Sequence, residues 1–387
     1  MDVITAVDGV KCYGIKEGIY GLGIVVCKGN VAGVFTKNKF KAAPVIVTQE
    51  HIKHGEIEGI IVNSGCANAF TGEEGLRNAK RMAEMLARKL NVPTWKIAVA
   101  STGVIGVQLN MKWIEEKFEL VYSNLGSSEE HSLSFARAIM TTDSFPKQCV
   151  VRVGDCVIAG VAKGAGMIAP NMATMLAFIF TDAKFDASEL YEMLKNAVDK
   201  TFNVTVVDGE TSTNDMVLLI ATGKKKVDKE LFEKKLEELC LNLSKVIARD
   251  GEGATKLIEV KVRGAKNDRE AFKAAKAVAS SILVKTALFG NDPNWGRIIA
   301  ALGNADVEVD EKLSIAFECL KNGKVIGEVT LVEKGRRLSN EEKAREMLRN
   351  SDEVIINIDL NIGKGYGYAI GCDLSYEYVR INSEYTT

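Results

Sequence analysis

The sequence predicts a mixed α/β protein in which stacked β-sheets carry helices on the outside. Strand-like runs often follow one another with no helix between them, which argues against a regular βαβ alternation. Several of these runs are apolar on both faces, as strands that are covered on each side are. The chain has 387 residues, too many for one small core, so we expect two domains or one large layered domain.

Apolar residues at helical spacing predict the helices. Two of them begin with a hydroxyl residue followed three positions later by glutamate, Thr71 with Glu74 and Ser339 with Glu342, which is the pattern of a capping box. The predicted helices cover about 71–90, the residues after 110, 187–201, 228–249, 268–284 and 339–349.

Runs of β-branched and aromatic residues predict the strands. The GKGYGYAIG segment imitates a nucleotide-binding loop, but Tyr366, Tyr368 and Ile370 alternate as in a strand, so we read it as a strand. The motif GxxxxGK[ST] does not occur in the chain. The other predicted strands are 19–26, 31–36, 58–63, 149–161, 175–181, 216–221, 257–263, 313–319, 324–332 and 353–359.

Composition argues against several classes of protein. A net charge of −1 leaves no large basic surface for nucleic acid. The N-terminal residues lack the pattern of a signal peptide, and the most apolar stretch, 167–180, contains Pro170 and is too short to cross a bilayer. We therefore expect a cytoplasmic protein without nucleic-acid or membrane partners. No two of the eight cysteines have CxxC spacing, so they predict buried apolar residues and no metal site.

Histidine is scarce in this sequence. His51, His54 and His131 all lie in polar segments. This setting argues against a Ser-His-Asp triad and against an HExxH zinc site. An enzyme built on this chain needs a nucleophile that is activated in another way.

The segment KGAGMIAPNMATMLAFIF is the most unusual one. It runs from Lys163 through a Gly-rich loop to Thr174 and then into an apolar strand. A threonine at the head of a buried strand is usually only a β-branched strand residue. However, an N-terminal threonine supplies its own base, because its free α-amine has a pKa near 8 and can take the hydroxyl proton. Such a role for Thr174 requires that the Ala173–Thr174 bond be broken first.

The motif KGAGMIAPNMATML resembles the self-cleavage motif of the ornithine acetyltransferases, also called glutamate N-acetyltransferases. Further blocks resemble the same family and occur in the family order over nearly the whole chain. They are NSGCANAFTG (63–72), STGVIG (101–106), TTDSFPK (141–147), DGEGATK (250–256), KTALFGNDPNWGRI (285–298) and GCDLSYEYVRIN (371–382).

The resemblance implies a reaction and a maturation step. The chain is expected to cut itself into an α fragment, 1–173, and a β fragment, 174–387, that stay associated as α2β2. The mature enzyme is expected to transfer the acetyl group of N2-acetyl-L-ornithine to L-glutamate through an acetyl-Thr174 intermediate, without a cofactor. Whether acetyl-CoA is also an acetyl donor is left open.

We expect Thr102 and Gly103 to end a strand and to open a tight turn. Glycine lets the backbone approach a substrate closely, and the threonine hydroxyl is a donor. Such donors suit an oxyanion hole, where one donor is worth roughly 3–4 kcal/mol. The resemblance implies this role for both residues, and the alternative is an ordinary strand-end turn.

The resemblance also implies a set of substrate-binding residues. Lys163 is suited to pair with the α-carboxylate of an amino acid, and Glu252, in a Gly-flanked loop, is suited to receive an ammonium group. Taken singly, each is more often plain surface charge. The matching positions are Thr142, Lys163, Thr174, Glu252, Asn382 and Thr387, and the choice of Thr142 over Thr141 is left open.

Two other functions remain open at this point. In a self-processing aminopeptidase, water takes the acyl group instead of an amino acid. In a non-catalytic binding protein, the chain stays uncut.

Overall fold

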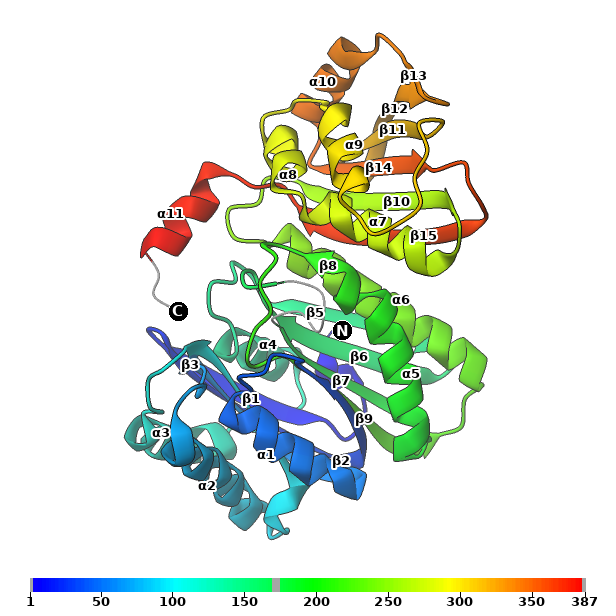
Figure 1. Cartoon of the computed structure of the whole chain (residues 1–387). Coiled ribbons are helices and arrows are strands. Elements are labelled where there is room, and N and C mark those ends of the chain that lie inside the picture. The colour runs from blue at the N-terminus through cyan, green and yellow to red at the C-terminus, as the bar shows by residue number, and fades with distance from the viewer. Residues whose placement is uncertain (1–2, 169–174, 385–387) are drawn as a thin grey trace. The chain divides into compact units, whose positions relative to one another are not determined.

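The computed structural model describes residues 3–168 and 175–384 (Figure 1). The described chain divides into two compact units. The first contains residues 3–203 and 210–243, and the second contains residues 204–209 and 244–384. Each unit is built on one β-sheet with helices packed on it, so the predicted mixed α/β class, with sheets inside and helices outside, is confirmed.

The first unit contains an eight-stranded sheet with the order β4-β3-β2-β9-β7-β6-β5, and β1 pairs with β2. The β3–β4 and β7–β9 pairs are parallel, and the other pairs are antiparallel. All residues of β6 and β7 are buried, as their apolar sequences predict. The strands are β1 (Lys11–Glu17), β2 (Tyr20–Phe35), β3 (Glu56–Cys66), β4 (Ile97–Val104), β5 (Lys147–Val153), β6 (Cys156–Lys163), β7 (Leu176–Ala183) and β9 (Met216–Lys225).

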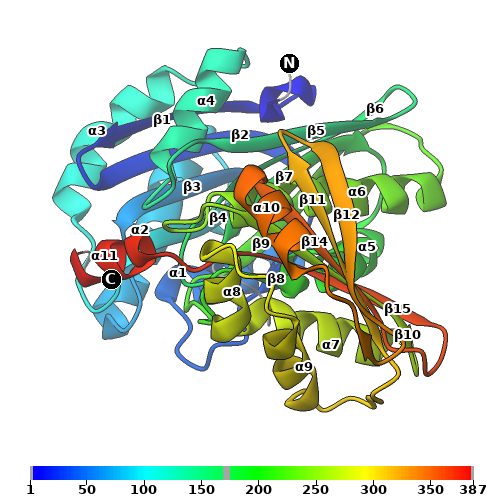
Figure 2. The ribbon, with the colours of Figure 1, turned by 90° about the horizontal axis from the view of Figure 1, so that it is seen from above.

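Helices cover this sheet because each has one apolar stripe. Helices α2 and α3 bury Leu22, Ile61 and Val99 of the sheet in one core cluster. Helix α4 packs against β1 and β2 (Figure 2). The helices are α1 (Ala43–His51), α2 (Gly72–Leu90), α3 (Met111–Ser123), α4 (Glu129–Ala138), α5 (Ala187–Lys200) and α6 (Lys229–Arg249), the last of which continues into the second unit.

The second unit contains a seven-stranded sheet with the order β13-β12-β11-β14-β10-β15-β8. Its core joins the sheet to α7, and Ala271, Ala275 and Val278 of that helix are buried. The strands are β8 (Thr205–Val206), β10 (Leu257–Ala265), β11 (Ser314–Lys321), β12 (Lys324–Glu333), β13 (Arg336–Arg337), β14 (Glu353–Asp359) and β15 (Gly365–Cys372). The helices are α7 (Asp268–Ser280), α8 (Ile282–Phe289), α9 (Trp295–Gly303), α10 (Glu341–Asn350) and α11 (Tyr376–Glu384). Short 3-10 turns are η1 (Ile4–Ala6), η2 (Ile52–His54), η3 (Thr94–Lys96) and η4 (Phe202–Val204).

Both predicted capping boxes are wrong. The Thr71 hydroxyl donates to Asn68 Oδ1 at 2.7 Å instead of capping α2. Helix α10 begins after Asn340, which makes no side-chain cap. The capping box that does form, Asp186 with Glu189 at the start of α5, has an aspartate where the predicted boxes had a hydroxyl residue.

Two predicted elements are divided in the structure. The 268–284 segment forms α7 and α8 with a break at Ser281, whose hydroxyl accepts the Val284 N–H at 3.3 Å and so caps α8. The 149–161 segment is the β5–β6 hairpin. Conversely, the predicted strands 19–26 and 31–36 are one long strand, β2, with an irregular pairing between Val26 and Gly29.

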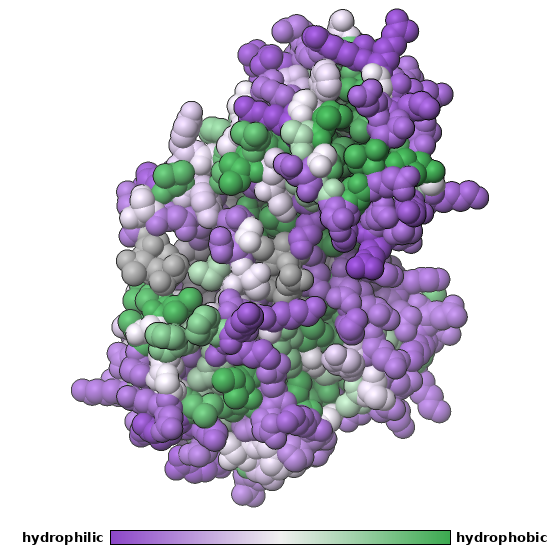
Figure 3. All heavy atoms as spheres, viewed as in Figure 1, coloured by the Kyte–Doolittle hydropathy of each residue, from purple (hydrophilic) through white to green (hydrophobic). Residues whose placement is uncertain are grey.

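The surface and the cysteines agree with the composition. Hydrophilic side chains cover most of the face in Figure 3, with apolar ones in separate groups. All eight cysteines are free, and seven of them are buried. Among the described residues, no helix is both long and apolar enough to cross a membrane.

Candidate active site

Lys163 is the last residue of β6 and is only 4% exposed. Its ammonium group donates to Thr141 Oγ1 at 2.8 Å and to Thr102 Oγ1 at 3.2 Å. Lys163 is paired across the sheet with Leu176, near the start of β7. Segments that are distant in the sequence therefore meet at this lysine, and each of them belongs to a block that was predicted to carry site residues.

Asp143 balances part of the positive charge of this lysine. Its Oδ2 lies 3.9 Å from Lys163 Nζ, and its Oδ1 lies 2.6 Å from Lys147 Nζ. The side chains of Asp143 and Lys147 are fully inaccessible to water. The N–H groups of Gly164 and Thr141 also donate to the Asp143 carboxylate, at 2.6 and 3.0 Å. The carboxylate thus fixes the end of β6 and the segment that carries Thr141.

The pKa of Asp143 lies well below its ordinary value. Burial alone raises it, but the charges of Lys163 and Lys147 and the hydrogen bonds from Lys147 and Gly164 outweigh burial. Asp143 is therefore ionised, and it faces the ammonium groups of two lysines, Lys147 and Lys163. A buried site that brings two lysines together suits an anionic group such as a carboxylate.

Thr102 and Gly103 lie in β4, beside β3. Gly103 has φ +131°, and a Cβ atom there would lie 2.4 Å from the carbonyl carbon of Gly65 and 2.5 Å from Cys66 N. Glycine is thus required at 103 by the close approach of β3, a reason that differs from the approach of a substrate that the sequence suggested.

A buried polar network lies behind Thr102. Asn214 donates to the carbonyl oxygens of Ala67 and Ser101, at 2.7 and 2.8 Å. The Ser101 hydroxyl donates to Asn63 Oδ1 at 2.6 Å. The network joins the ends of β3 and β4 to the segment before β9, and it holds the backbone next to Thr102 in place.

In the second unit, two predicted residues meet although they lie far apart in the sequence. Asn382 Nδ2, on α11, donates to Glu252 Oε2 at 2.7 Å, and Glu252 is 9% exposed. The adjacent Gly253 has φ +69°, and its carbonyl accepts the Ser375 hydroxyl at 2.6 Å. The loop that carries Glu252 is therefore fastened to the segment that leads into α11.

Some predicted site residues lie outside the described residues. These are Ala173, Thr174 and Thr387. Of the two threonines in the TTD block, the one whose hydroxyl contacts Lys163 is Thr141. Asp143, Lys147 and Asn214 were not predicted as site residues.

The three histidines make structural contacts away from this cluster. His51 Nδ1 lies 2.7 Å from the carbonyl oxygen of Ile97. His54 packs on Trp95, with ring centroids 4.3 Å apart. His131 Nδ1 lies 2.5 Å from the Ser128 hydroxyl. Within the described ranges, no group of three or more His, Cys, Asp or Glu side chains could hold a metal ion.

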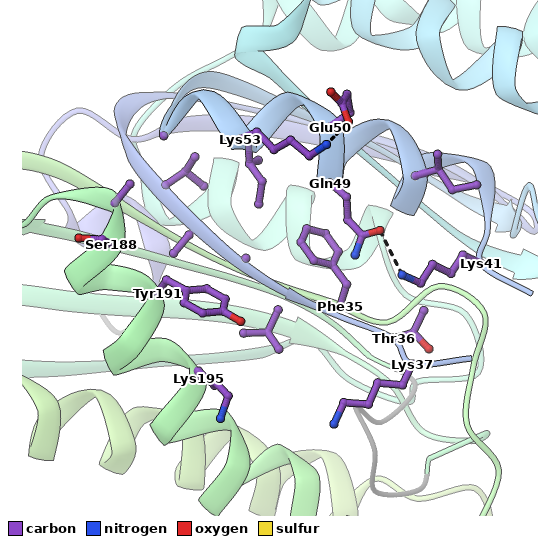
Figure 4. A pocket seen from close by; sticks show the side chains of 18 of the residues that line it. Phe35, Thr36, Lys37, Lys41, Gln49, Glu50, Lys53, Ser188, Tyr191 and Lys195 are labelled. Atoms are coloured by element: carbon purple, nitrogen blue, oxygen red, sulfur yellow. Dashed lines mark hydrogen bonds and ion pairs between the residues drawn. The ribbon is translucent and has the colours of Figure 1, made fainter. Parts of the chain in front are cut away.

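A groove of about 1060 Å³ lies in the first unit, lined by β2, α1 and α5 (Figure 4). Its lysines are largely engaged, since Lys53 pairs with Glu50 at 2.5 Å and Lys41 donates to Gln49 at 3.3 Å. None of the residues predicted for the site lines this groove. The buried cluster around Lys163 is therefore the better candidate for chemistry.

The fold and this cluster belong to an enzyme, and the names of related chains give its class as acyltransferase. The chain is a member of the ArgJ family, whose model matches residues 7–387. The resemblance seen in the sequence is thereby confirmed, and the non-catalytic alternative is set aside.

Related proteins cover nearly the whole chain. The arginine biosynthesis bifunctional protein ArgJ of Archaeoglobus fulgidus is 56% identical over 99% of this chain and 100% of its own length. The glutamate N-acetyltransferase of Methanosarcina mazei is 48% identical over 99% of this chain and 98% of its own. A solved ornithine acetyltransferase from Mycobacterium tuberculosis, in complex with ornithine, is 36% identical, with a TM-score of 0.43 over 44% of this chain and 95% of that chain.

Proposed function

We propose that this protein transfers the acetyl group of N2-acetyl-L-ornithine to L-glutamate through an acetyl ester on Thr174, after cutting its own chain between Ala173 and Thr174. The observation that carries the proposal is the buried Lys163, which contacts the Thr102 and Thr141 hydroxyls and is paired with the start of β7. The names of the relatives, one a glutamate N-acetyltransferase and one solved with ornithine, support the choice of substrates.

The first step is maturation. The Thr174 hydroxyl attacks the carbonyl carbon of Ala173, the peptide bond becomes an ester, and water hydrolyses the ester. The products are the fragments 1–173 and 174–387, and Thr174 gains a free α-amine. The α and β fragments are expected to remain together as α2β2, in the cytoplasm.

In the second step the new amine of Thr174 takes the hydroxyl proton, and the hydroxyl attacks the acetyl carbonyl. Thr102 and the Gly103 N–H stabilise the oxyanion. Because Lys163 donates to the Thr102 oxygen, the Thr102 hydroxyl proton is free to point at another acceptor. Ornithine leaves, glutamate enters, and the glutamate amine takes the acetyl group from Thr174.

Binding of both amino acids is assigned by charge. Lys163 receives the α-carboxylate, and Lys147 lies on the other oxygen of the same aspartate, Asp143. Glu252, held by Asn382, receives an ammonium group. Thr142 and Thr387 complete the proposed substrate contacts.

Intact-mass spectrometry beside a Thr174→Ala chain tests the first step. We expect two masses for the natural chain, ending at Ala173 and beginning at Thr174, and one uncut mass for the variant. A variant that still splits at this bond removes Thr174 as the nucleophile.

Steady-state kinetics with both substrates test the second step. A ping-pong reaction gives parallel double-reciprocal lines and a trapped acetyl group on the β fragment. Release of acetate without glutamate would instead favour the hydrolase, in which water is the acceptor. Replacing acetylornithine by acetyl-CoA decides whether the enzyme has a second donor.

A further inference from the structure

Asp215 lies directly before β9 and is completely buried. Its Oδ1 accepts the N–H of Met175 at 3.1 Å. Met175 is also held from its other side, because its carbonyl oxygen accepts the N–H of Met216 at 3.1 Å. The backbone of Asp215 is fixed in turn, since its own carbonyl accepts the N–H of Thr36 at 3.0 Å.

The pKa of the Asp215 carboxyl is raised. Burial raises it well above the ordinary value, and the hydrogen bonds from Met175 and from the Thr36 side chain and the charge of Lys163 only partly oppose this. The second oxygen, Oδ2, has no hydrogen-bond partner among the described residues. A buried, ionised carboxylate would need more partners than these, as the hydrogen bonds and the two lysines around Asp143 illustrate.

We infer that Asp215 is a positioning residue for self-cleavage, acting as a buried hydrogen-bond acceptor that fixes the Met175 amide. The inference rests on the function proposed above. Met175 is the residue that follows the proposed nucleophile Thr174. Because a peptide unit is planar, the bond to Asp215 fixes the orientation of the peptide plane at the Met175 nitrogen. The proposed attack of the Thr174 hydroxyl on the Ala173 carbonyl needs a well-oriented backbone, since small misplacements of reacting groups slow a reaction strongly.

Strand β7, which begins directly after Met175, offers a matched control at its other end. Asp182 is 1% exposed, and its Oδ1 accepts the N–H of Val157 at 2.8 Å. It differs from Asp215 in charge, since it pairs with Lys225 at 2.8 Å. Replacing Asp182 likewise removes a buried carboxyl, but at the end of β7 that is far from Met175.

The experiment measures the rate at which freshly made full-length chain splits. Pulse-labelled chain from cell-free synthesis is followed on denaturing gels for the natural sequence, Asp215→Ala, Asp215→Asn and Asp182→Ala. We expect Asp215→Ala to cleave at least about tenfold more slowly, the rate equivalent of one buried hydrogen bond. Asp215→Asn keeps a neutral acceptor and should retain most of the rate. Asp182→Ala should cleave at the natural rate. Circular dichroism melting reports whether each variant is folded.

Two results overturn the inference. One is a folded Asp215→Ala chain that splits at the natural rate. The other is an Asp215→Asn chain that is as slow as Asp215→Ala, because then the acid itself would be required and not the acceptor. The pH profile gives a check that does not depend on the alanine variant folding: the natural and Asp215→Asn chains should have the same profile between pH 5 and 8. A natural chain that never splits overturns the proposed function as a whole.

Discussion

Asp143 holds two lysine ammonium groups in a place that water does not reach. Its carboxylate meets Lys147 and Lys163 and accepts two backbone N–H groups. Charges buried in this way cost free energy unless they are paired, so each member of the cluster depends on the others. Lys163 also contacts the Thr102 hydroxyl, so the cluster is joined to the end of β4.

We predict that Asp143→Asn destabilises the protein by about 3–5 kcal/mol, because it removes the buried carboxylate that both Lys147 and Lys163 contact. The free energy of unfolding in urea measures this, in a Thr174→Ala background so that a single uncut chain unfolds. Asp8→Asn is the control, since Asp8 pairs with Lys224 at the same 2.6 Å but is 79% exposed. That change should cost less than about 1 kcal/mol. Equal losses from both variants would contradict the argument from burial.

Two aspartates should give opposite dependences of stability on pH. The folded-state pKa of Asp143 is depressed, so its contribution is present above the unfolded value of about 3.9 and is lost as pH falls through the folded pKa. The pKa of Asp215 is raised, so the native state keeps a proton that the unfolded chain releases, and stability falls as pH rises above about 4.

Urea unfolding between pH 3 and 8 measures the difference for the natural sequence and for the two asparagine variants, each in the Thr174→Ala background so that one uncut chain unfolds. The advantage of the natural sequence over Asp143→Asn should shrink in acid. Asp215→Asn should gain on the natural sequence as the pH rises. Parallel curves for Asp215→Asn would mean that this carboxyl is ionised.

Lys163 should matter for turnover as well as for folding. We predict that Lys163→Ala lowers kcat/KM for glutamate by about 100-fold or more, since removing one partner of a buried charge pair costs about 2–5 kcal/mol. Steady-state kinetics check this on protein that has matured. Lys53→Ala, at the groove of Figure 4, is the control and should leave kcat/KM unchanged. A natural kcat/KM in Lys163→Ala would remove the lysine from the substrate site.

The sequence led to Lys163 and Thr102 but not to Asp143 or Lys147. Both missed residues lie in the TTDSFPK block and look like ordinary polar residues of a surface loop. What makes them important is the approach of β6, whose Gly164 N–H and Lys163 ammonium meet the same carboxylate. That approach is a tertiary contact, and no local sequence pattern predicts it. The one available hint was their place beside a threonine already assigned to the site.

At the scale of elements, strand β4 owes its shape to its neighbour β3. Gly103 lies opposite Gly65, and the two backbones approach so closely that no Cβ fits. The Thr102 hydroxyl thus sits on a strand end that cannot move away from β3 without breaking the parallel pairing.

We predict that Gly103→Ala destabilises the first unit and slows self-cleavage. Gly106→Ala separates the strain of a positive φ from the clash with β3. Gly106 also has a positive φ, +82°, but has open space around it. Gly106→Ala should cost about 1–2 kcal/mol, the penalty of the left-handed backbone alone. Thermal melting should show a larger loss for Gly103→Ala, and equal losses would argue that the contact with Gly65 is unimportant.

Helices and strands were predicted well where a single apolar stripe or a single alternating run of residues determines them. The alternation of Tyr366, Tyr368 and Ile370 predicted β15, and the stripe of α2 predicted its extent. The predicted capping box at Thr71 did not form because a hydroxyl group has several possible hydrogen-bond partners. The Thr71 hydroxyl donates to Asn68 Oδ1 instead of capping α2. Helix α1 was missed because its sequence, APVIVTQEH, has apolar residues in succession and resembles a strand.

At the scale of the whole molecule, the proposed cleavage does not separate the two compact units. Strands β7 and β9 belong to the proposed β fragment but lie side by side within the first sheet, between β2 and β6 of the α fragment. Two ladders of backbone hydrogen bonds, β2–β9 and β6–β7, would therefore join the fragments.

We predict that the mature fragments co-elute in size-exclusion chromatography and separate only in denaturant. We also predict that 1–173 made alone is insoluble, because it exposes the unpaired edges of β2 and β6. Co-synthesis with 174–387 should restore soluble protein. A stable, monomeric 1–173 would show that its part of the sheet folds without β7 and β9.

The placement of β7 and β9 also determines whether the mature protein can refold after it unfolds. An uncut chain returns from unfolding by a unimolecular reaction, whereas two fragments must first find one another. The recovery of the mature enzyme after heating should then depend on its concentration, and dilution should make the damage permanent. Cleavage would in this way make unfolding of the enzyme irreversible. The stability of the mature enzyme would then be set by its rate of unfolding and not by an equilibrium free energy.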